Sequence, residues 1–148
     1  MSRAFVREDD ARPDEPALPV DEREAPVTPL GHARLTERLA ELARQPTEGR
    51  ATRQLARRLE RLHVVHGPPP DRERVAFGAR VTVEGEDGGR ATFRIVGPDE
   101  TAFHEGGVSV ASPVARALLG ARVGDAVRVQ RPRGAHEVVI CQVVYADP

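Results

Sequence analysis

Three consecutive prolines at positions 68–70, preceded by Gly67, divide this chain of 148 residues into two parts. Proline lacks a backbone N–H and its ring clashes with the preceding helical turn, so no helix continues through such a run. A run of prolines is also stiff and extended. We therefore predict a proline-rich linker over residues 67–74, with one structural unit before it and another after it.

The segment at the N-terminus is too acidic and too polar to form a core. Residues 1–26 hold eight acidic residues, four arginines and four of the 13 prolines. Such a stretch buries too little apolar surface to offset the entropy that is lost on ordering. We predict a disordered acidic tail over residues 1–26. Its first residues are charged and do not have the apolar run of a secretory signal peptide.

Residues 27–66 are predicted to form two short amphipathic helices. Thr28 can cap the first helix, and Pro29 suits its first turn. Leucines then recur with helical spacing on both sides of a break at residues 45–49. These leucines are Leu35, Leu39, Leu42, Leu55, Leu59 and Leu62. A turn with Pro and Gly between two such helices predicts a short antiparallel hairpin, a truncated coiled coil.

Arginines crowd the second predicted helix, and two interpretations of them stay open. The arginines are Arg53, Arg57, Arg58 and Arg61. They can form a solvated face beside the leucine seam, or a basic surface for an acidic partner or nucleic acid. No aromatic residue lies among them, which weakens a role in base stacking.

Residues 75–148 alternate polar and apolar side chains as strands do. The predicted strands cover residues 81–83, 91–96, 108–110, 127–129 and 138–144. Gly-containing turns at residues 86–89 and 133–134 join neighbouring strands. Ser112 and Pro113 predict the start of a short helix over residues 114–119, which Gly120 ends. Strands, one short helix and further strands predict an α+β domain with an antiparallel sheet.

The composition excludes several kinds of site. The chain has one cysteine, Cys141, which excludes an internal disulfide and a cysteine-based zinc site. We predict that Cys141 is a small buried apolar residue of the last strand. All 22 basic residues are arginine, which excludes lysine Schiff-base chemistry. His63 and His66 have no third ligand nearby, so we predict no metal and no cofactor, and no apolar run is long enough for a membrane helix.

The short helix and the turn that follows it carry a distinctive motif. Residues 112–120 read Ser-Pro-Val-Ala-Arg-Ala-Leu-Leu-Gly, and residues 123–127 read Val-Gly-Asp-Ala-Val. Residues 95–100 (Ile-Val-Gly-Pro-Asp-Glu) and the Val-Thr-Pro-x-Gly start at residues 27–31 belong to the same pattern. The combination resembles the C-terminal domain of the bacterial transcript cleavage factors GreA and GreB. Residues 1–10 resemble a GreB-type N-terminus.

The resemblance implies an FKBP-like C-terminal domain that docks at the rim of the RNA polymerase secondary channel. It places the polymerase contact near the short helix and its flanking loops, which hold Ser112, Pro113, Leu118, Leu119 and Gly120. We add Phe103 and His104 to the predicted contact set because a loop aromatic can anchor an interface. Two alternatives stay open: Phe103 and His104 can cover an edge of the core instead, and one of the adjacent Leu118 and Leu119 can face the core while the other is the contact residue. In the family, a long helical hairpin enters the channel, and an Asp and a Glu at its tip help to hold a second Mg²⁺, an ion that prefers carboxylate oxygens. The resemblance also implies a cytoplasmic, non-enzymatic monomer without membrane contact, which meets nucleic acid only indirectly in the elongation complex.

The predicted hairpin departs from the family at its tip. The turn over residues 44–50 holds one acidic residue, Glu48, with Arg44 and Arg50 at its ends. A first helix over residues 29–44 reaches roughly 24 Å, about half the arm length of family members. This layout resembles the short-armed Rnk group, from which the GreB-like N-terminus departs. We predict a regulator that binds RNA polymerase and modulates elongation without stimulating transcript cleavage.

Two other functions stay open as alternatives. One is an active cleavage-stimulating factor that uses Glu48 or tail carboxylates such as Asp9 and Asp10, which lie far from the turn in sequence. The other is a peptidyl-prolyl isomerase, suggested only by the FKBP-like fold. That chemistry needs an aromatic-lined pocket, whereas the aromatic residues from position 71 onward are Phe77, Phe93, Phe103 and Tyr145.

Overall fold

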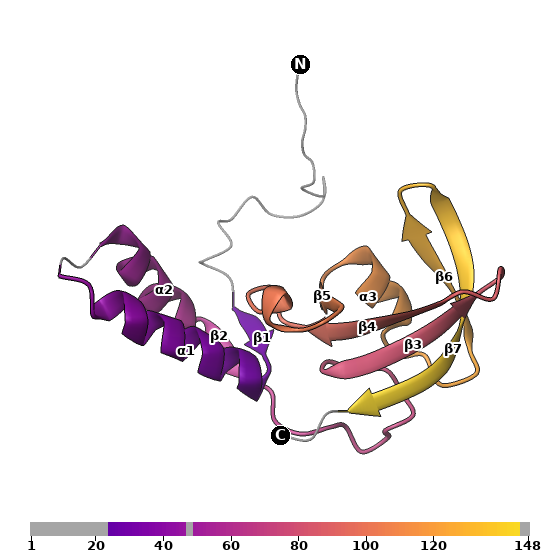
Figure 1. Cartoon of the computed structure of the whole chain (residues 1–148). Helices are drawn as coiled ribbons and strands as arrows, with labels where there is room; N and C mark the ends of the chain where they lie inside the picture. The colour runs from indigo at the N-terminus through magenta and orange to yellow at the C-terminus, as the bar shows by residue number, and fades with distance from the viewer. Residues whose placement is uncertain (1–23, 47–48, 146–148) are drawn as a thin grey trace.

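The computed structural model describes residues 24–46 and 49–145 (Figure 1). The predicted tail up to residue 23 and the turn residue Glu48 lie outside the described residues. The described part has two regions: a pair of helices with a two-stranded sheet, and a five-stranded sheet with one short α-helix. This is the mixed α+β composition that the sequence predicts.

The two helices of the first region lie side by side (Figure 1). Helix α1 spans Pro29–Ala43 and helix α2 spans Arg50–Glu60. The Thr28 hydroxyl accepts a hydrogen bond from the Gly31 N–H at 3.0 Å, so the predicted cap is confirmed. The leucine stripe is the covered side of each helix, with Leu35 buried and Leu39, Leu42, Leu55 and Leu59 half-buried. No helix in the described ranges is long and apolar enough to cross a membrane.

Two short parallel strands at the base of the helices were not predicted. Strand β1 spans Ala25–Val27 and strand β2 spans Leu62–Val64, with Ala25 opposite Leu62. The prediction that Leu62 continues the second helix is wrong, because residues 62–64 pair with β1 instead. The end of the predicted tail is also wrong, because Ala25 and Pro26 belong to β1 and Ala25 is buried there.

The second region is a five-stranded sheet with the order β5-β4-β3-β7-β6. Its strands are β3 (Ala79–Gly85), β4 (Arg90–Val96), β5 (Gly107–Ser109), β6 (Ala126–Arg131) and β7 (Gly134–Tyr145). The predicted hairpins β3–β4 and β6–β7 are confirmed, and β3 also pairs antiparallel with β7. Strand β5 differs from the predicted antiparallel sheet because it pairs parallel with β4. The connection over residues 97–106 carries the chain back along the sheet, so β5 enters in the direction of β4.

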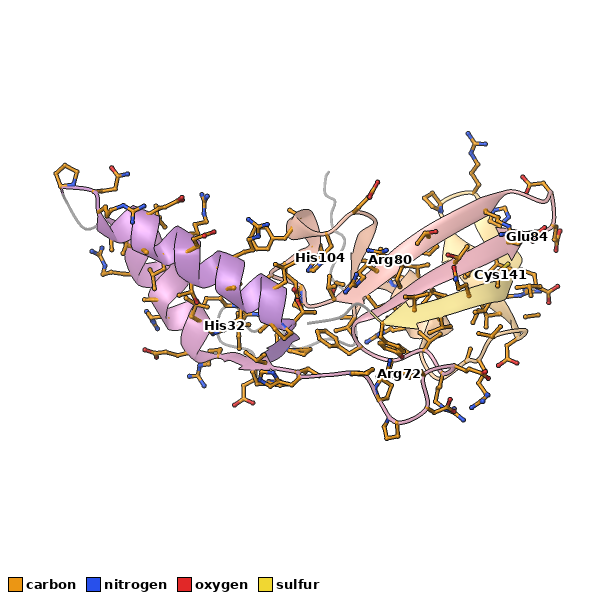
Figure 2. All side chains as sticks on the ribbon, turned by 60° about the horizontal axis from the view of Figure 1, so that its bottom comes forward. His32, Arg72, Arg80, Glu84, His104 and Cys141 are labelled. Carbon is orange, nitrogen blue, oxygen red and sulfur yellow. The ribbon has the colours of Figure 1, made fainter. Side chains whose placement is uncertain are left out.

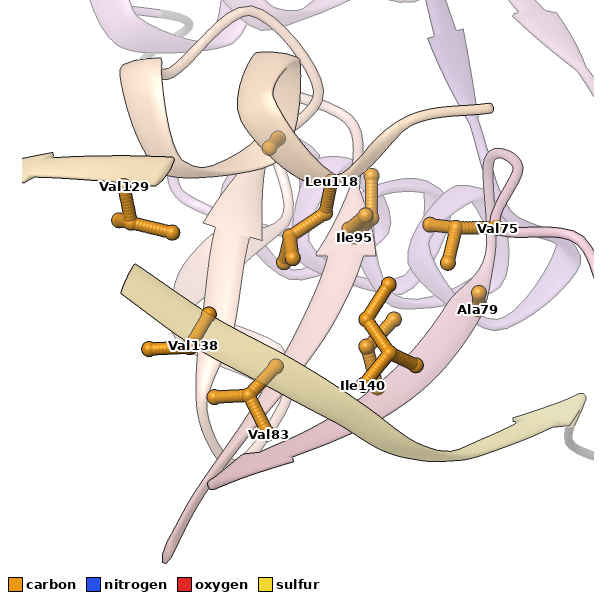
Figure 3. Packing of buried hydrophobic residues seen from close by; sticks show 10 residues of the cluster. Val75, Ala79, Val83, Ile95, Leu118, Val129, Val138 and Ile140 are labelled. Carbon is orange, nitrogen blue, oxygen red and sulfur yellow. The ribbon is translucent and has the colours of Figure 1, made fainter. Parts of the chain in front are cut away.

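The core lies between the inner face of this sheet and helix α3 (Pro113–Leu118). Figure 3 shows Leu118 pointing from α3 toward Ile95 of β4 and Ile140 of β7. Strand β3 alternates as predicted, because Ala79, Val81 and Val83 are buried while the residues between them are more exposed. The opposite, outer face of the sheet is therefore the more exposed one, and it carries Val139 and Val144 beside polar side chains.

Cys141 lies in an irregular part of β7 and not in the core. Thr82 of β3 pairs with Gln142, but the next residue, Val83, pairs with Ile140, so Cys141 has no partner across the ladder. A bulge of this kind turns the extra residue out of the regular alternation. Cys141 is half-buried, and its Sγ lies 3.7 Å from Oε1 of Glu84 on the outer side (Figure 2). The prediction of a buried apolar cysteine is wrong for this reason.

The proline-rich segment packs against the sheet region at its C-terminal end. No helix passes through the prolines, as predicted. Asp71 forms an ion pair with Arg122, and the Val75 N–H donates to the Ala121 carbonyl at 2.8 Å. The segment is therefore attached to the sheet over its last residues and does not form a free spacer along its whole length.

Candidate functional site

The predicted contact residues fall into two groups on different elements. Ser112, Pro113, Leu118, Leu119 and Gly120 belong to α3 and its ends. Phe103 and His104 belong to the short 3-10 helix η2 (Thr101–Phe103) and the residue after it. Strand β5 contacts both elements and lies between them in the sequence. The two groups therefore have separate surroundings.

Helix α3 turns its start to the surface and its end to the core. The Ser112 Oγ accepts a backbone N–H of the first turn at 3.3 Å, and Pro113 is exposed. Leu118 is 0% exposed, so it cannot contact a partner and the predicted contact role is wrong for this residue. Leu119 is half-buried and Gly120 is exposed. Pro113, Leu119 and Gly120 thus provide the accessible surface of this group.

Phe103 and His104 are adjacent, but their side chains have different environments. Phe103 is 38% exposed, which suits a contact residue. The His104 side chain is only 6% exposed, and its Nε2 lies 2.9 Å from Oε1 of Glu100. The predicted role of His104 as a surface contact is therefore wrong, because its ring is used inside the molecule.

Glu100 is the centre of the junction between the helices and the sheet. Its side chain is 0% exposed. Oε2 accepts the backbone N–H groups of Thr28 and Gly97, each at 2.8 Å, while Oε1 accepts the Thr28 hydroxyl and the Nε2 of His104. A buried carboxylate is tolerated only when such donors replace its hydration. One side chain therefore joins the start of α1 to the loop between β4 and β5.

A second ion pair joins the other helix to the same loop. The Nε and the terminal NH2 nitrogen of Arg58 lie 2.8 Å and 2.7 Å from the two carboxylate oxygens of Asp99. The Arg58 side chain is 8% exposed. A bidentate pair with little solvent is geometrically specific, so it fixes α2 relative to the loop. Arg58 therefore belongs neither to a solvated face nor to a basic surface for a partner. It is buried in the ion pair that holds the two regions together.

Sequence reasoning did not find this junction. Residues 27–31 and 95–100 both stand out as parts of the family-like pattern, but Thr28 and Glu100 are 72 positions apart. No spacing rule connects residues at that separation. A usable signal was that each segment carries one glycine, Gly31 and Gly97, because a residue without a side chain permits close approach of other groups.

A substitution at Gly97 measures how closely the backbones of the two regions are packed at this junction. A Cβ at position 97 would overlap the backbone oxygen of Pro26 in β1, and a backbone atom cannot rotate away. We expect Gly97→Ala to lower the free energy of unfolding by about 1–3 kcal/mol through overpacking. Gly49→Ala is the control, because a Cβ at Gly49 meets nothing within 4 Å. Urea denaturation measures both variants, and equal small losses would show that the junction is loose.

The far end of the helices is basic in its described part. Arg44 caps the C-terminus of α1 and Arg50 begins α2, and both are exposed. Within residues 24–46 and 49–145, no cluster of three or more His, Cys, Asp or Glu side chains could hold a metal ion. His63 and His66, which follow α2 at the opposite end of the helices, are both exposed. The described residues of this end do not suit Mg²⁺, which needs several oxygen ligands.

Two comparisons of the sequence with known proteins, one with a family model and one with curated relatives, agree on one family. Residues 69–145 match the family described as "Transcription elongation factor, GreA/GreB, C-term". The chain is 38% identical to transcription elongation factor GreB of Xanthomonas axonopodis over 161 aligned positions, which cover 87% of this chain and 96% of that protein. It is 45% identical to GreB of Pseudomonas aeruginosa over 91 residues, which cover 62% of this chain and about half, 54%, of that protein. Among solved structures, a GreA/GreB elongation factor of Nitrosomonas europaea aligns over 82% of this chain and 98% of that chain, at 23% identity and a TM-score of 0.47.

Proposed function

Since the chain belongs to the GreA/GreB family of transcription elongation factors, we propose that it binds RNA polymerase and regulates elongation without stimulating transcript cleavage. It docks through the sheet region at the rim of the secondary channel and is not itself catalytic. The sheet region is FKBP-like and serves as a docking module. The protein acts as a cytoplasmic monomer and meets nucleic acid only through the elongation complex.

The length of the helices is the observation that carries the proposal. Helix α1 has 15 residues and α2 has 11. At a rise of 1.5 Å per residue, α1 reaches only about 22 Å. The alignment with the Xanthomonas GreB has 161 positions, more than the 148 residues of this chain, so this chain lacks residues that the relative has. We propose that the missing residues belong to the helical arm, which then stops short of the polymerase active centre.

The charge at the end of the arm supports the same conclusion. Arg44 and Arg50 flank the turn, and no Asp occurs from residue 22 to residue 70. Glu48 is the single acidic residue of the turn. One carboxylate beside two guanidinium groups binds Mg²⁺ poorly, because the positive charges repel the ion and too few oxygens are present. The arm therefore lacks both the reach and the ligands for cleavage stimulation.

The surface of α3 and η2 is the proposed docking site. Phe103, Pro113 and Leu119 offer apolar surface next to polar groups, and an exposed aromatic side chain is a frequent anchor in protein interfaces. The Arg58–Asp99 pair and the Glu100 hydrogen bonds hold the helices at one angle to this surface. Docking through the sheet region then fixes where the arm points.

Transcript cleavage in a stalled elongation complex tests the proposal. We expect the chain alone to leave cleavage at its intrinsic rate, and an excess of it to inhibit an authentic Gre factor. Pro113→Glu should abolish this inhibition without unfolding α3, because Glu is favourable in the first turn of a helix. Glu86→Gln, in the exposed β3–β4 turn, is the control and should inhibit like the unmodified chain.

Two results would contradict the proposal. Stimulation of cleavage by the chain alone would show that Glu48 or the tail supplies enough carboxylates. Absence of both inhibition and polymerase binding would show that the family fold is used with another partner. A Thr47→Asp variant adds a second carboxylate to the turn without lengthening the arm. We expect it still not to stimulate transcript cleavage, because the arm is too short.

A further inference from the structure

A hollow of about 570 Å³ lies between the start of α1 and the outer face of the sheet. It is separate from the accessible surface of α3. Its walls include Pro29 and Leu30 of α1, the aromatic rings of Phe77, Phe103 and Tyr145, and the arginines Arg80 and Arg94. Figure 2 shows Arg80 and His104 in this region, between the helices and the sheet. Its volume falls in the range of sites that enclose a small organic molecule.

Arg80 and Arg94 both line this hollow, and among the described residues the exposed Glu105, which also lines it, forms an ion pair with neither arginine. Arg80 of β3 and Arg94 of β4 are direct cross-strand partners, so their side chains leave the same face of the sheet. Among the described residues, neither arginine takes part in any of the ion pairs. Like charges at directly opposed positions destabilise a sheet. The repulsion between the two guanidinium groups therefore destabilises the sheet, and an anion bound between them would relieve that repulsion.

Arg94 also has an unused hydrogen-bond donor. Its Nε is buried and has no hydrogen-bond partner in the described part of the chain. Burial and the positive charge of Arg80 lower the pKa of Arg94, while the charge of Glu100 acts in the opposite direction. Glu100 is already occupied by its four donors, so it does not serve as a direct partner. An unpaired buried donor on a charged group is uncommon and calls for a ligand.

The aromatic walls decide which kind of anion fits. Phe77 is half-buried and Phe103 is partly exposed, so both rings offer surface to the hollow. The Tyr145 hydroxyl is engaged, since it donates to the Arg74 carbonyl at 2.5 Å and accepts from the Ala76 N–H at 3.0 Å, so only its ring faces a ligand. Flat rings stack on nucleobases, and guanidinium groups bind phosphate in bidentate fashion. A carboxylate side chain of a protein would use the arginines but leave the rings unused.

We propose that this hollow binds a nucleoside phosphate, with its phosphate groups between Arg80 and Arg94 and its base against Phe77 and Phe103. The occupant would touch the start of α1 and the sheet together. Binding therefore stabilises the junction that Glu100 forms, and raises the unfolding temperature with ligand concentration. Phe103 is shared with the proposed docking surface, but binding of the nucleoside phosphate can be measured on the isolated chain, without RNA polymerase.

Calorimetric titration of the full chain with ATP, in low salt and without added metal ion, tests the proposal. We expect saturable binding at one site and a rise of the unfolding temperature with ATP. Arg80→Gln and Arg94→Gln should each weaken binding by about tenfold or more, as expected for the loss of a charge-assisted contact. Arg128→Gln is the matched control, because Arg128 is an exposed arginine of strand β6 outside the hollow, and it should bind ATP within about twofold of the unmodified chain.

Further probes separate the parts of the ligand. Pyrophosphate should bind more weakly than ATP, and Phe103→Ala should weaken ATP but not pyrophosphate. Equal affinities for pyrophosphate and ATP would overturn the assignment of a base site.

Absence of saturable binding at millimolar ATP, or equal losses in Arg128→Gln and Arg94→Gln, would overturn the whole site. A synthetic peptide of residues 1–23 serves as a competitor. If this peptide displaces ATP when its concentration is below that of ATP, the hollow is assigned to the acidic segment of the chain instead. Because Arg80 is exposed, Arg80→Gln keeps the test valid even if Arg94→Gln fails to fold.

Discussion

Glu100→Gln lowers the free energy of unfolding by about 3–5 kcal/mol, the range for removing one member of a buried charged network. The glutamine has the same shape, but its amide NH2 would face N–H donors that now bind a carboxylate oxygen. Thr28, Gly97 and His104 provide those donors. Each donor left without an acceptor costs about 1–3 kcal/mol, and repacking recovers part of that. The unfolding temperature should fall on the order of 10 °C.

Differential scanning calorimetry measures this change, with Glu105→Gln as the control. Glu105 is exposed, so we expect that variant to unfold within about 0.5 kcal/mol of the unmodified chain. Amide exchange adds a local readout. The Val65 N–H, which donates to the Val27 carbonyl at 2.9 Å in the small sheet, should lose protection in Glu100→Gln. An unchanged unfolding temperature would show that the Glu100 hydrogen bonds contribute nothing to stability, and that the Arg58–Asp99 ion pair is sufficient to hold the two regions together.

Leu118→Ala and Leu119→Ala separate folding from docking. Leu118 is completely buried among the sheet residues, so its truncation leaves a cavity and costs about 2–5 kcal/mol. Leu119 is half-buried, and its truncation should cost less than about 1.5 kcal/mol. Urea denaturation of the two variants measures both values. A larger loss for Leu119 would reverse the assignment of core and surface on this helix.

The same pair of variants bears on the proposed function. We expect Leu119→Ala to fold normally and to weaken inhibition of an authentic Gre factor, because Leu119 belongs to the accessible part of α3. Leu118→Ala should affect inhibition only in proportion to the fraction of unfolded protein. Normal inhibition by Leu119→Ala, together with its loss in Pro113→Glu, would restrict the docking site to the first turn of α3.

Local sequence rules were sufficient for most of the secondary structure. The Thr28 and Ser112 caps, the helical leucine spacing and the β3–β4 turn each depend on neighbours within a few positions, and all are present in the structure. The motif at residues 112–127 also identified the family from sequence alone. These features are local because capping, amphipathic spacing and turn formation depend on residues that are adjacent in the chain.

Local rules failed where a segment pairs with a distant one. The leucine stripe extends to Leu62, but the partner strand at residues 25–27 converts Leu62 from helix to strand. Strand β5 runs parallel to β4 because of the path of the connecting loop. Cys141 leaves the core because the bulge breaks the alternation that the sequence predicts.

Tertiary structure alone decided which residues of the predicted contact set are available. Two adjacent leucines look equivalent in sequence, but only the angle at which α3 packs on the sheet buries Leu118 and leaves Leu119 partly exposed. His104 looks like a loop residue until the fold places a buried carboxylate next to it. The sequence by itself determined the family, the element types and the short basic arm, since these depend on composition and short-range spacing. The Glu100 junction and the pair of arginines in the hollow exist only because residues distant in the chain are brought within hydrogen-bonding distance or onto one face of the sheet.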